Sequence, residues 1–205
     1  LKYDLGIIFE KDFSTGTALT GEIVNGSGIG EADENYLFDK DKYKNFMLRV
    51  NQAIGEKVSA GFFAYTGREL LSDPTSVHAD VTDNIKMFGP DLVINLDEKL
   101  ILNFQYLWRT DSHVFDESEG GPLTDIRTQG GFAEIIYAPR GDMSKWYFTG
   151  LLNLVESDYN VLDYSSFTLH CGYLLRRNMR AVGEFTQRFS GVSYGMISAG
   201  IITAF

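Results

Sequence analysis

The sequence predicts an all-β protein, a transmembrane antiparallel up-and-down β-barrel, on three observations. Apolar and polar residues alternate with a period of two along most of the chain. The connections between these segments are short and long in turn. Charged residues gather on one face of the segments and apolar residues on the other. A charged face in a dry core would cost several kcal/mol for each unpaired charge, whereas charge turned toward water and apolar residues toward lipid avoid that cost.

Composition excludes several other classes of protein. The chain has 205 residues and a hydrophobic fraction of 44%, too high for a disordered chain. Its 18 Lys and Arg against 28 Asp and Glu give a net charge of −10, which argues against binding to nucleic acid. One cysteine excludes an internal disulfide, a cysteine-rich zinc site and covalently attached haem. No apolar run approaches the roughly 18 residues of a membrane helix.

Eleven segments fit the strand period. Most have about 10 residues, the length that a tilted strand needs to cross a bilayer. The expected strands are 1–10, 14–25, 43–53, 57–67, 85–95, 99–109, 128–138, 145–155, 165–175, 179–189 and 194–205. Aromatic residues near their ends are expected to form girdles at the membrane interfaces: Tyr3, Phe63, Tyr65, Tyr137, Trp146, Tyr147, Tyr173 and Phe205.

The connections alternate in length. Short turns are expected at 10–14, 54–57, 95–99, 139–143 and 176–178. Longer loops are expected at 26–42, 68–84 and 110–127. Short turns on one side and long loops on the other are typical of bacterial outer-membrane barrels, so the sequence predicts that location for the protein.

The number of strands predicts that residues 1–205 are one transmembrane barrel domain with strands missing upstream. Eleven is odd, whereas bacterial single-chain barrels have an even number of strands. The alternating segment 193–205 ends on Phe205, as the last strand of outer-membrane barrels does. We therefore expect the chain to be the C-terminal portion of a larger barrel; the alternative is that one of the eleven expected strands is wrong.

Charged residues on the polar face are the candidate site, as the lining of a pore. Four are basic and four acidic, a mixed set whose local field would bias passing ions. The predicted pore-lining residues are Glu22, Arg49, Asp91, Arg109, Glu134, Arg180, Glu184 and Arg188. The alternative is that these charges pair across strands to hold the wall, for example Arg180 with Glu184 or with Glu134.

No other constellation predicts catalysis, a metal site or a cofactor. The three histidines, His78, His113 and His170, are far apart in the sequence. Asp111-Ser112-His113 has the residue types of a hydrolase triad without a supporting motif, so an outer-membrane enzyme is only a third reading. Cys171 is expected to be an apolar residue that faces lipid or the wall. Two acidic loops could be ordinary surface or could bind divalent cations: Glu31, Asp33, Glu34, Asp39 and Asp41 in one, and Asp111, Asp116, Glu117, Glu119 and Asp125 in the other.

Six stretches and the terminal Phe resemble the phosphate-selective porin family of Gram-negative outer membranes. These stretches are GEIVNGSG (21–28), DKDKYKNFMLRV (39–50), AGFFAYTGRE (60–69), FGPDLVINL (88–96), GGFAEIIYAPRGDMSKWYFTGLLNLVESD (130–158) and YSSFTLHCGYLLRRNMRAVGEFT (164–186). The resemblance implies the C-terminal part of a barrel of about 16 or more strands, often a trimer, through which small solutes diffuse.

The expected function is a water-filled channel for passive diffusion of ions and small hydrophilic solutes, anions such as phosphate among them. The expected partners are outer-membrane lipid and lipopolysaccharide, the solutes and further copies of the chain in a trimer, with no nucleic acid, no cofactor and no enzymatic activity. The alternative function is a barrel that sheathes an electron-transfer or secreted partner protein, in which case the lumen would be filled.

Overall fold

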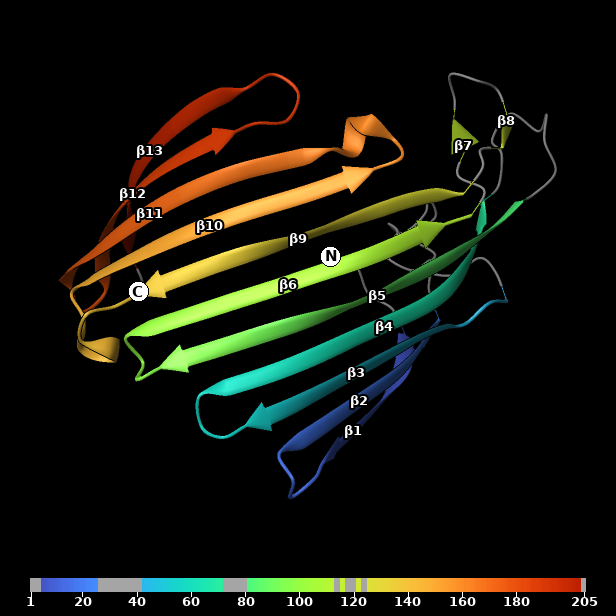
Figure 1. Cartoon of the computed structure of the whole chain (residues 1–205), viewed down its shortest axis with the longest axis horizontal. Coiled ribbons are helices and arrows are strands. Elements are labelled where there is room, and N and C mark those ends of the chain that lie inside the picture. The colour runs from blue at the N-terminus through green and yellow to red at the C-terminus, as the bar shows by residue number, and fades with distance from the viewer. Residues whose placement is uncertain are drawn as a thin grey trace. The chain divides into compact units, whose positions relative to one another are not determined.

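Eleven antiparallel strands form one sheet in a computed structural model of the chain (Figure 1). The structure describes residues 5–25, 42–71, 81–112, 115–116, 121–122 and 125–203. Each strand is hydrogen-bonded to the next strand of the sheet along the chain, so the topology is up-and-down, as predicted. The strands are β1 (Leu5–Asp12), β2 (Thr17–Asn25), β3 (Asn45–Ile54), β4 (Val58–Leu71), β5 (Val81–Leu96), β6 (Leu100–Asp111), β9 (Ile126–Tyr137), β10 (Trp146–Ser157), β11 (Tyr164–Arg176), β12 (Met179–Arg188) and β13 (Tyr194–Thr203).

The described residues also contain four short elements within the connections. β7 (Phe115–Asp116) and β8 (Gly121–Pro122) pair with each other inside the predicted loop 110–127. Single turns of 3-10 helix lie between β9 and β10 (η1, Gly141–Met143) and between β10 and β11 (η2, Asn160–Leu162). No helix among the described residues is long and apolar enough to cross a membrane.

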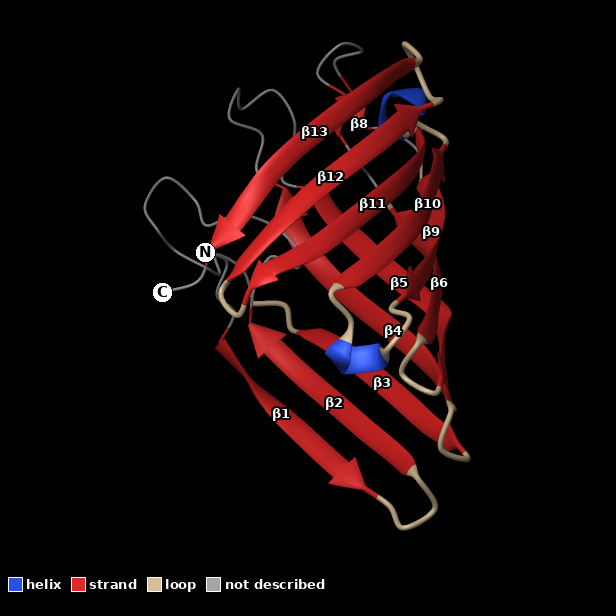
Figure 2. Ribbon diagram, turned by 90° about the vertical axis from the view of Figure 1, so that its left-hand side faces the viewer, coloured by secondary structure: helices blue, strands red, loops and turns tan. Residues whose placement is uncertain are grey.

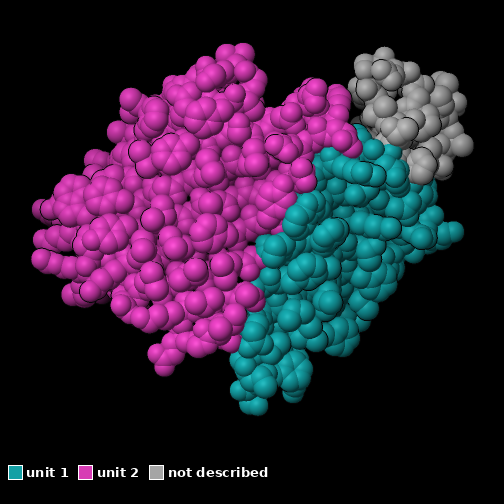
Figure 3. All heavy atoms as spheres, in the orientation of Figure 1, with its two compact units in different colours: residues 1–52, 61–90, 107–128 teal, residues 53–60, 91–106, 129–205 magenta. Residues whose placement is uncertain are grey.

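The chain forms two compact units, coloured separately in Figure 3. Unit 1 comprises 1–52, 61–90 and 107–128, and unit 2 comprises 53–60, 91–106 and 129–205. Several strands of the sheet therefore contribute residues to both units. Within unit 2, β10, β11, β12 and β13 pair in order, as Figure 2 shows.

All eleven expected strands are present, and β4 and β5 exceed their predicted lengths the most. β4 continues to Leu71 and β5 begins at Val81, so the connection between them is shorter than the expected loop 68–84. The residues next to the predicted ends, Arg68 and Glu69 on β4 and Asp83 and Asn84 on β5, are polar or charged, which is why the sequence predicts a loop there. In the structure the Arg68 backbone N–H donates to the Asn45 side chain at 2.9 Å, and Asp83 is buried on β5. Polar side chains of neighbouring strands thus support β4 and β5 beyond the residues in which apolar and polar positions alternate.

The turn between β5 and β6 is a tight hairpin. Asp97 and Glu98 both have positive φ, 55° and 59°, and the Lys99 N–H donates to the Leu96 carbonyl at 3.1 Å. The Asn95 side chain accepts a further bond from the Glu98 N–H at 2.9 Å. Two successive positive φ values are characteristic of the hairpin turns that match the twist of paired strands. The hairpin therefore forms without glycine at either central position.

Apolar side chains are exposed on this sheet and polar ones are buried. Among the described residues, the buried apolar side chains are Val24, Ile85 and Met87, and the buried polar ones are Asn45, Asp83, Asp111 and Ser166. Many large apolar side chains are exposed instead, among them Phe46, Leu48, Phe148, Leu152 and Leu169. A water-soluble sheet buries its apolar face. The described residues therefore form no apolar core of the soluble kind.

Candidate functional site: the polar face of the sheet

The register of β2 and β3 in unit 1 places Glu22 and Arg49 on one face. Glu22 is opposite Met47 and Thr20 is opposite Arg49, so alternate residues from these two pairs share a side. Phe46, Leu48, Leu19 and Ile23 are on the other side, where all four are exposed. The alternation predicted for 43–53 is confirmed. On the polar side Asn45 is fully buried, and its Oδ1 accepts the Arg68 N–H.

Arg109 and Asp111 form the tightest charge pair of unit 1. They lie two residues apart on β6 and so project to the same face. Arg109 donates from Nε and Nη2 to the Asp111 carboxylate, at 2.7 and 2.6 Å. Asp111 and the neighbouring Asp83 are both buried, and Asp83 is close enough to interact electrostatically with Arg109. The positive charge of Arg109 is thus compensated inside the protein.

Unit 2 carries five of the predicted pore-lining residues. Arg180, Glu184 and Arg188 alternate along β12 on one face, opposite Leu174, His170 and Ser166 of β11. Glu134 of β9 accepts a hydrogen bond from Asn103 of β6 at 2.7 Å. Asp91 of β5 is partly buried. The register thus confirms that Arg180, Glu184 and Arg188 share a face; that they line a lumen stays a prediction.

The expected cross-strand pairing of Arg180 with Glu184 or Glu134 is wrong. The Arg180 guanidinium lies over the Tyr147 ring, 4.9 Å from its centroid, and Glu184 contacts His170 instead. Arg188 lies over the Tyr164 ring at 5.3 Å, and its Nε contacts the Ser190 hydroxyl. Aromatic faces attract cations without neutralising them. Neither arginine pairs with a carboxylate in the part of the chain that the structure describes, so both charges remain uncompensated there.

Hydroxyl and amide groups also form hydrogen bonds on this face, which they share with the apolar residues Leu151, Val155, Leu174 and Val182. The Thr168 and Thr186 hydroxyls lie 2.8 Å apart across β11 and β12. The Asn153 amide donates to the Ser166 hydroxyl at 3.3 Å, where Ser166 is only 1% exposed. The polar face of unit 2 thus carries hydrogen-bonded side chains and two arginines, Arg180 and Arg188, that pair with no carboxylate among the described residues.

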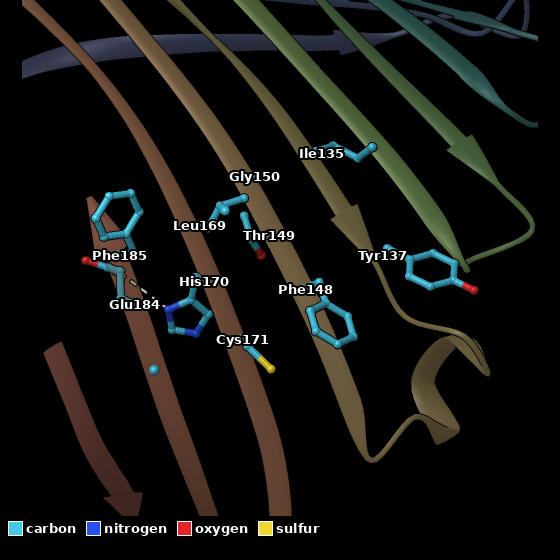
Figure 4. A pocket seen from close by; sticks show the side chains of 11 residues that line it. Ile135, Tyr137, Phe148, Thr149, Gly150, Leu169, His170, Cys171, Glu184 and Phe185 are labelled. Carbon is cyan, nitrogen blue, oxygen red and sulfur yellow. Dashed lines mark hydrogen bonds and ion pairs between the residues drawn. The ribbon is translucent and has the colours of Figure 1, made fainter. Parts of the chain in front are cut away.

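The opposite face of unit 2 is apolar. Trp146, Phe148, Leu152 and Leu154 of β10 share it with Phe167, Leu169, Cys171 and Tyr173 of β11, as the register of the two strands requires. Gly150 and Gly183 have no side chains here, which leaves an open hollow of about 500 Å³ (Figure 4). Its walls include Ile135, Phe148, Leu169, Cys171 and Phe185. Cys171 is on the apolar face, as expected.

Two of the aromatic residues predicted to form girdles belong to the polar face. Trp146 and Tyr173 do pair across the apolar face near η1, with ring centroids 4.3 Å apart. Tyr147, in contrast, is opposite Gly172 on the polar face, where its hydroxyl lies 2.9 Å from His170 Nε2. Tyr65 is also misassigned, because its hydroxyl fills the space above buried Gly67 beside Asn45. Tyr3 and Phe205 lie outside the described residues.

Sequence reasoning missed the contact between Tyr147 and His170. His170 alternates with Ser166 and Thr168, which would have assigned it to the polar face. The partner could not be identified, because the register between β10 and β11 does not follow from either strand alone.

Several expected features lie wholly or partly outside the described residues. They include His78, His113, and the acidic residues Glu31, Asp33, Glu34, Asp39, Asp41, Glu117 and Glu119. Ser112, the middle residue of the possible triad, accepts hydrogen bonds from the backbone and the side chain of Asn84.

Within the described residues, no three histidine, cysteine, aspartate or glutamate side chains come together as a metal site. Comparison of the chain with protein-family models, with curated proteins and with solved structures found no match.

Proposed function

We propose that this chain forms the wall of a water-filled channel in the outer membrane, through which ions and small hydrophilic solutes diffuse passively. The observation that carries the proposal is the inverted exposure of the two faces: apolar side chains such as Leu152 are exposed, while Asn45 and Ser166 are buried. In a barrel that spans a bilayer, the apolar face contacts lipid and the polar face contacts the lumen. The uninterrupted up-and-down order of the sheet fits the same architecture.

The size of the apolar face supports its contact with lipid. On β10 it runs from Trp146 to Leu154, eight residue steps or about 26 Å along the strand. At a tilt of about 40° this distance corresponds to about 20 Å across the membrane, comparable with the roughly 25 Å apolar band of such barrels. The next residue on that face, Glu156, accepts a hydrogen bond from Gln129 at 3.2 Å. Aromatic residues mark one end of the face and polar residues mark the other.

The open arginines support a preference for anions. Arg109 is compensated by Asp111, whereas Arg180 and Arg188 lie on tyrosine rings and pair with no carboxylate among the described residues. Uncompensated charges in a narrow polar passage bias the ions that cross it. This agrees with the resemblance to phosphate-selective porins. Anions, phosphate included, are therefore the proposed preferred solutes, although the whole chain is acidic.

The test is conductance of the full-length protein in planar bilayers with a KCl gradient. We expect open channels and a reversal potential of anionic sign. Arg180→Gln and Arg188→Gln together should move the reversal potential toward cations. Arg140→Gln is the matched control, because Arg140 lies in the turn after β9, and it should shift the potential less. If folded protein inserted into the bilayer but never conducted, the channel proposal would be overturned. The alternative function, a sheath around a partner protein, would then remain.

A further inference from the structure

Tyr147, His170 and Glu184 form a hydrogen-bonded chain across β10, β11 and β12. The Tyr147 hydroxyl lies 2.9 Å from His170 Nε2, and His170 Nδ1 lies 3.4 Å from Glu184 Oε2. The second contact is the dashed line in Figure 4. His170 is directly opposite Thr149 on one neighbouring strand and Glu184 on the other. Its imidazole is partly buried, with 22% of the side chain exposed, and Glu184 is more open.

Gly172 makes this arrangement possible. It is buried and directly opposite Tyr147, and a Cβ at position 172 would collide with the Tyr147 ring. Without that side chain, the phenol ring crosses the backbone of β11 and brings its hydroxyl to His170, two residues away. The contact between Tyr147 and His170 therefore depends on the glycine at position 172 of β11, and not only on the conformation of the Tyr147 side chain.

The charged and titratable groups around His170 come from two strands. β12 contributes Glu184 and Arg180, and β10 contributes Tyr147, whose ring lies beneath the Arg180 guanidinium. The residues of β13 opposite Glu184 and Val182 are Ser198 and Gly200, which carry no charge. With a neutral imidazole, the charges of Arg180 and Glu184 sum to zero over the cluster, although the two side chains do not form an ion pair.

Protonation of His170 would change both the hydrogen bonds and the charge. In the neutral ring, a proton on Nδ1 is donated to Glu184 and Nε2 accepts the Tyr147 hydroxyl, the tautomer that this network favours. In the imidazolium both nitrogens donate, so Tyr147 becomes the acceptor and its hydroxyl hydrogen turns away. The cluster then carries one positive charge beside Arg180. Imidazoles gain their proton within the range of about pH 5 to 8.

We propose that the Tyr147–His170–Glu184–Arg180 cluster is a proton-binding site that sets the ion preference of the channel, so that acidification favours anions. This inference rests on the proposed function. One unit charge about 10 Å from a passing ion contributes roughly 0.4 kcal/mol in water, which is about twofold for each ion and less after screening by salt. We therefore expect the anion-to-cation permeability ratio to rise about twofold to fourfold between pH 8 and pH 5.5 at low ionic strength.

The experiment compares the wild type with His170→Gln and Glu184→Gln in planar bilayers at both pH values. The wild-type ratio should rise on acidification, and His170→Gln should abolish the rise. Glu184→Gln should raise the ratio at pH 8 and keep a further rise at pH 5.5. A rise of equal size in His170→Gln, or none in the wild type, would overturn the proton site while the channel itself still stands.

A second measurement applies even if the protein does not conduct. Histidine-labelled protein in micelles should give an imidazole NMR signal that changes when the pH is lowered from 8 to 5.5 and that is missing from His170→Gln. A His170 signal that stays unchanged over this range would refute the proton site. Absence of conductance with a normal titration would instead refute the proposed channel.

Discussion

The two faces of strands β10 to β13 differ in the exposure of their side chains. On one face Phe148, Leu152 and Leu169 are each about half exposed, whereas on the other Ser166 is 1% exposed and hydrogen-bonded. In a soluble sandwich the apolar face would be the covered one. Alternation in the sequence separates the two faces, and exposure and hydrogen bonding then distinguish them: the apolar side chains are the exposed ones and the buried polar side chains are hydrogen-bonded. The proposed membrane channel would place the apolar face against lipid.

The polar face differs in turn between the two units. In unit 1 Arg109 is bound through two nitrogens to Asp111, so its charge is compensated. In unit 2 Arg180 and Arg188 lie on aromatic rings, and Glu184 is engaged by His170. The arginines on β6 and β12 therefore differ in their partners: Arg109 binds a carboxylate, whereas Arg180 and Arg188 contact aromatic rings and would, in the proposed channel, present positive charge to solutes.

The largest expected effect comes from a charge placed on the wrong face. Leu152→Arg puts a guanidinium on the apolar face near the middle of β10, which should destabilise the membrane-inserted protein by about 2–4 kcal/mol. Asn153→Arg is the matched control, since the adjacent residue projects to the polar face, and it should cost much less. Urea titrations of both variants in lipid vesicles measure the difference. Equal losses would mean that the two faces meet similar media.

The next effect concerns the compensated arginine. Arg109→Met removes the partner of the buried Asp111 carboxylate, which should cost about 3 kcal/mol because an uncompensated charge stays buried. Arg109→Met combined with Asp111→Leu should recover part of that loss, since the Asp111 charge is removed while Asp83 stays buried without the guanidinium. The same urea titration measures both variants. A double variant as unstable as the single one would assign the loss to packing of the arginine stem.

Much of the fold could be predicted because alternation is a local property. The number of strands, the alternating connections and the shared face of Arg180, Glu184 and Arg188 all follow from residues two apart. Contacts across strands could not be predicted, because a shift of one residue in register changes every partner. The wrong pairing of Arg180 and the missed contact of Tyr147 are both of this kind. Gly172 is one glycine among 21, and only the register gives it a role.

A smaller effect is expected at the turns, which lie beyond both faces. Glu98 has a φ of 59°, a conformation in which a side chain is strained by roughly 1 kcal/mol and glycine is not. Glu98→Gly should therefore stabilise the protein by about 1 kcal/mol. Glu56→Gly is the control, because Glu56 is also in a hairpin turn but has no positive φ, and this change should not stabilise. A similar gain in both variants would attribute the effect to charge.

The smallest effect is the pH dependence of an exposed ion pair that joins this turn to the turn between β3 and β4. Lys57 Nζ donates to Asp97 Oδ1 at 2.7 Å and lowers the pKa of Asp97 below its ordinary value of 3.8, mainly through this hydrogen bond. The folded carboxylate therefore binds protons less readily than the unfolded one. Its stabilising contribution is complete above about pH 4 and is lost as the pH falls through the lowered pKa. Lys57→Met should thus shift the urea midpoint slightly at pH 6 and leave it unchanged at the most acidic pH. The control is Lys145→Met, a change at an exposed lysine in the turn before β10. Its urea midpoint should not approach that of the wild type as the pH falls. If the Lys57→Met shift persisted in acid, the contribution of Lys57 to stability would not depend on the Asp97 carboxylate. Charge pairing would then not stabilise this pair of turns.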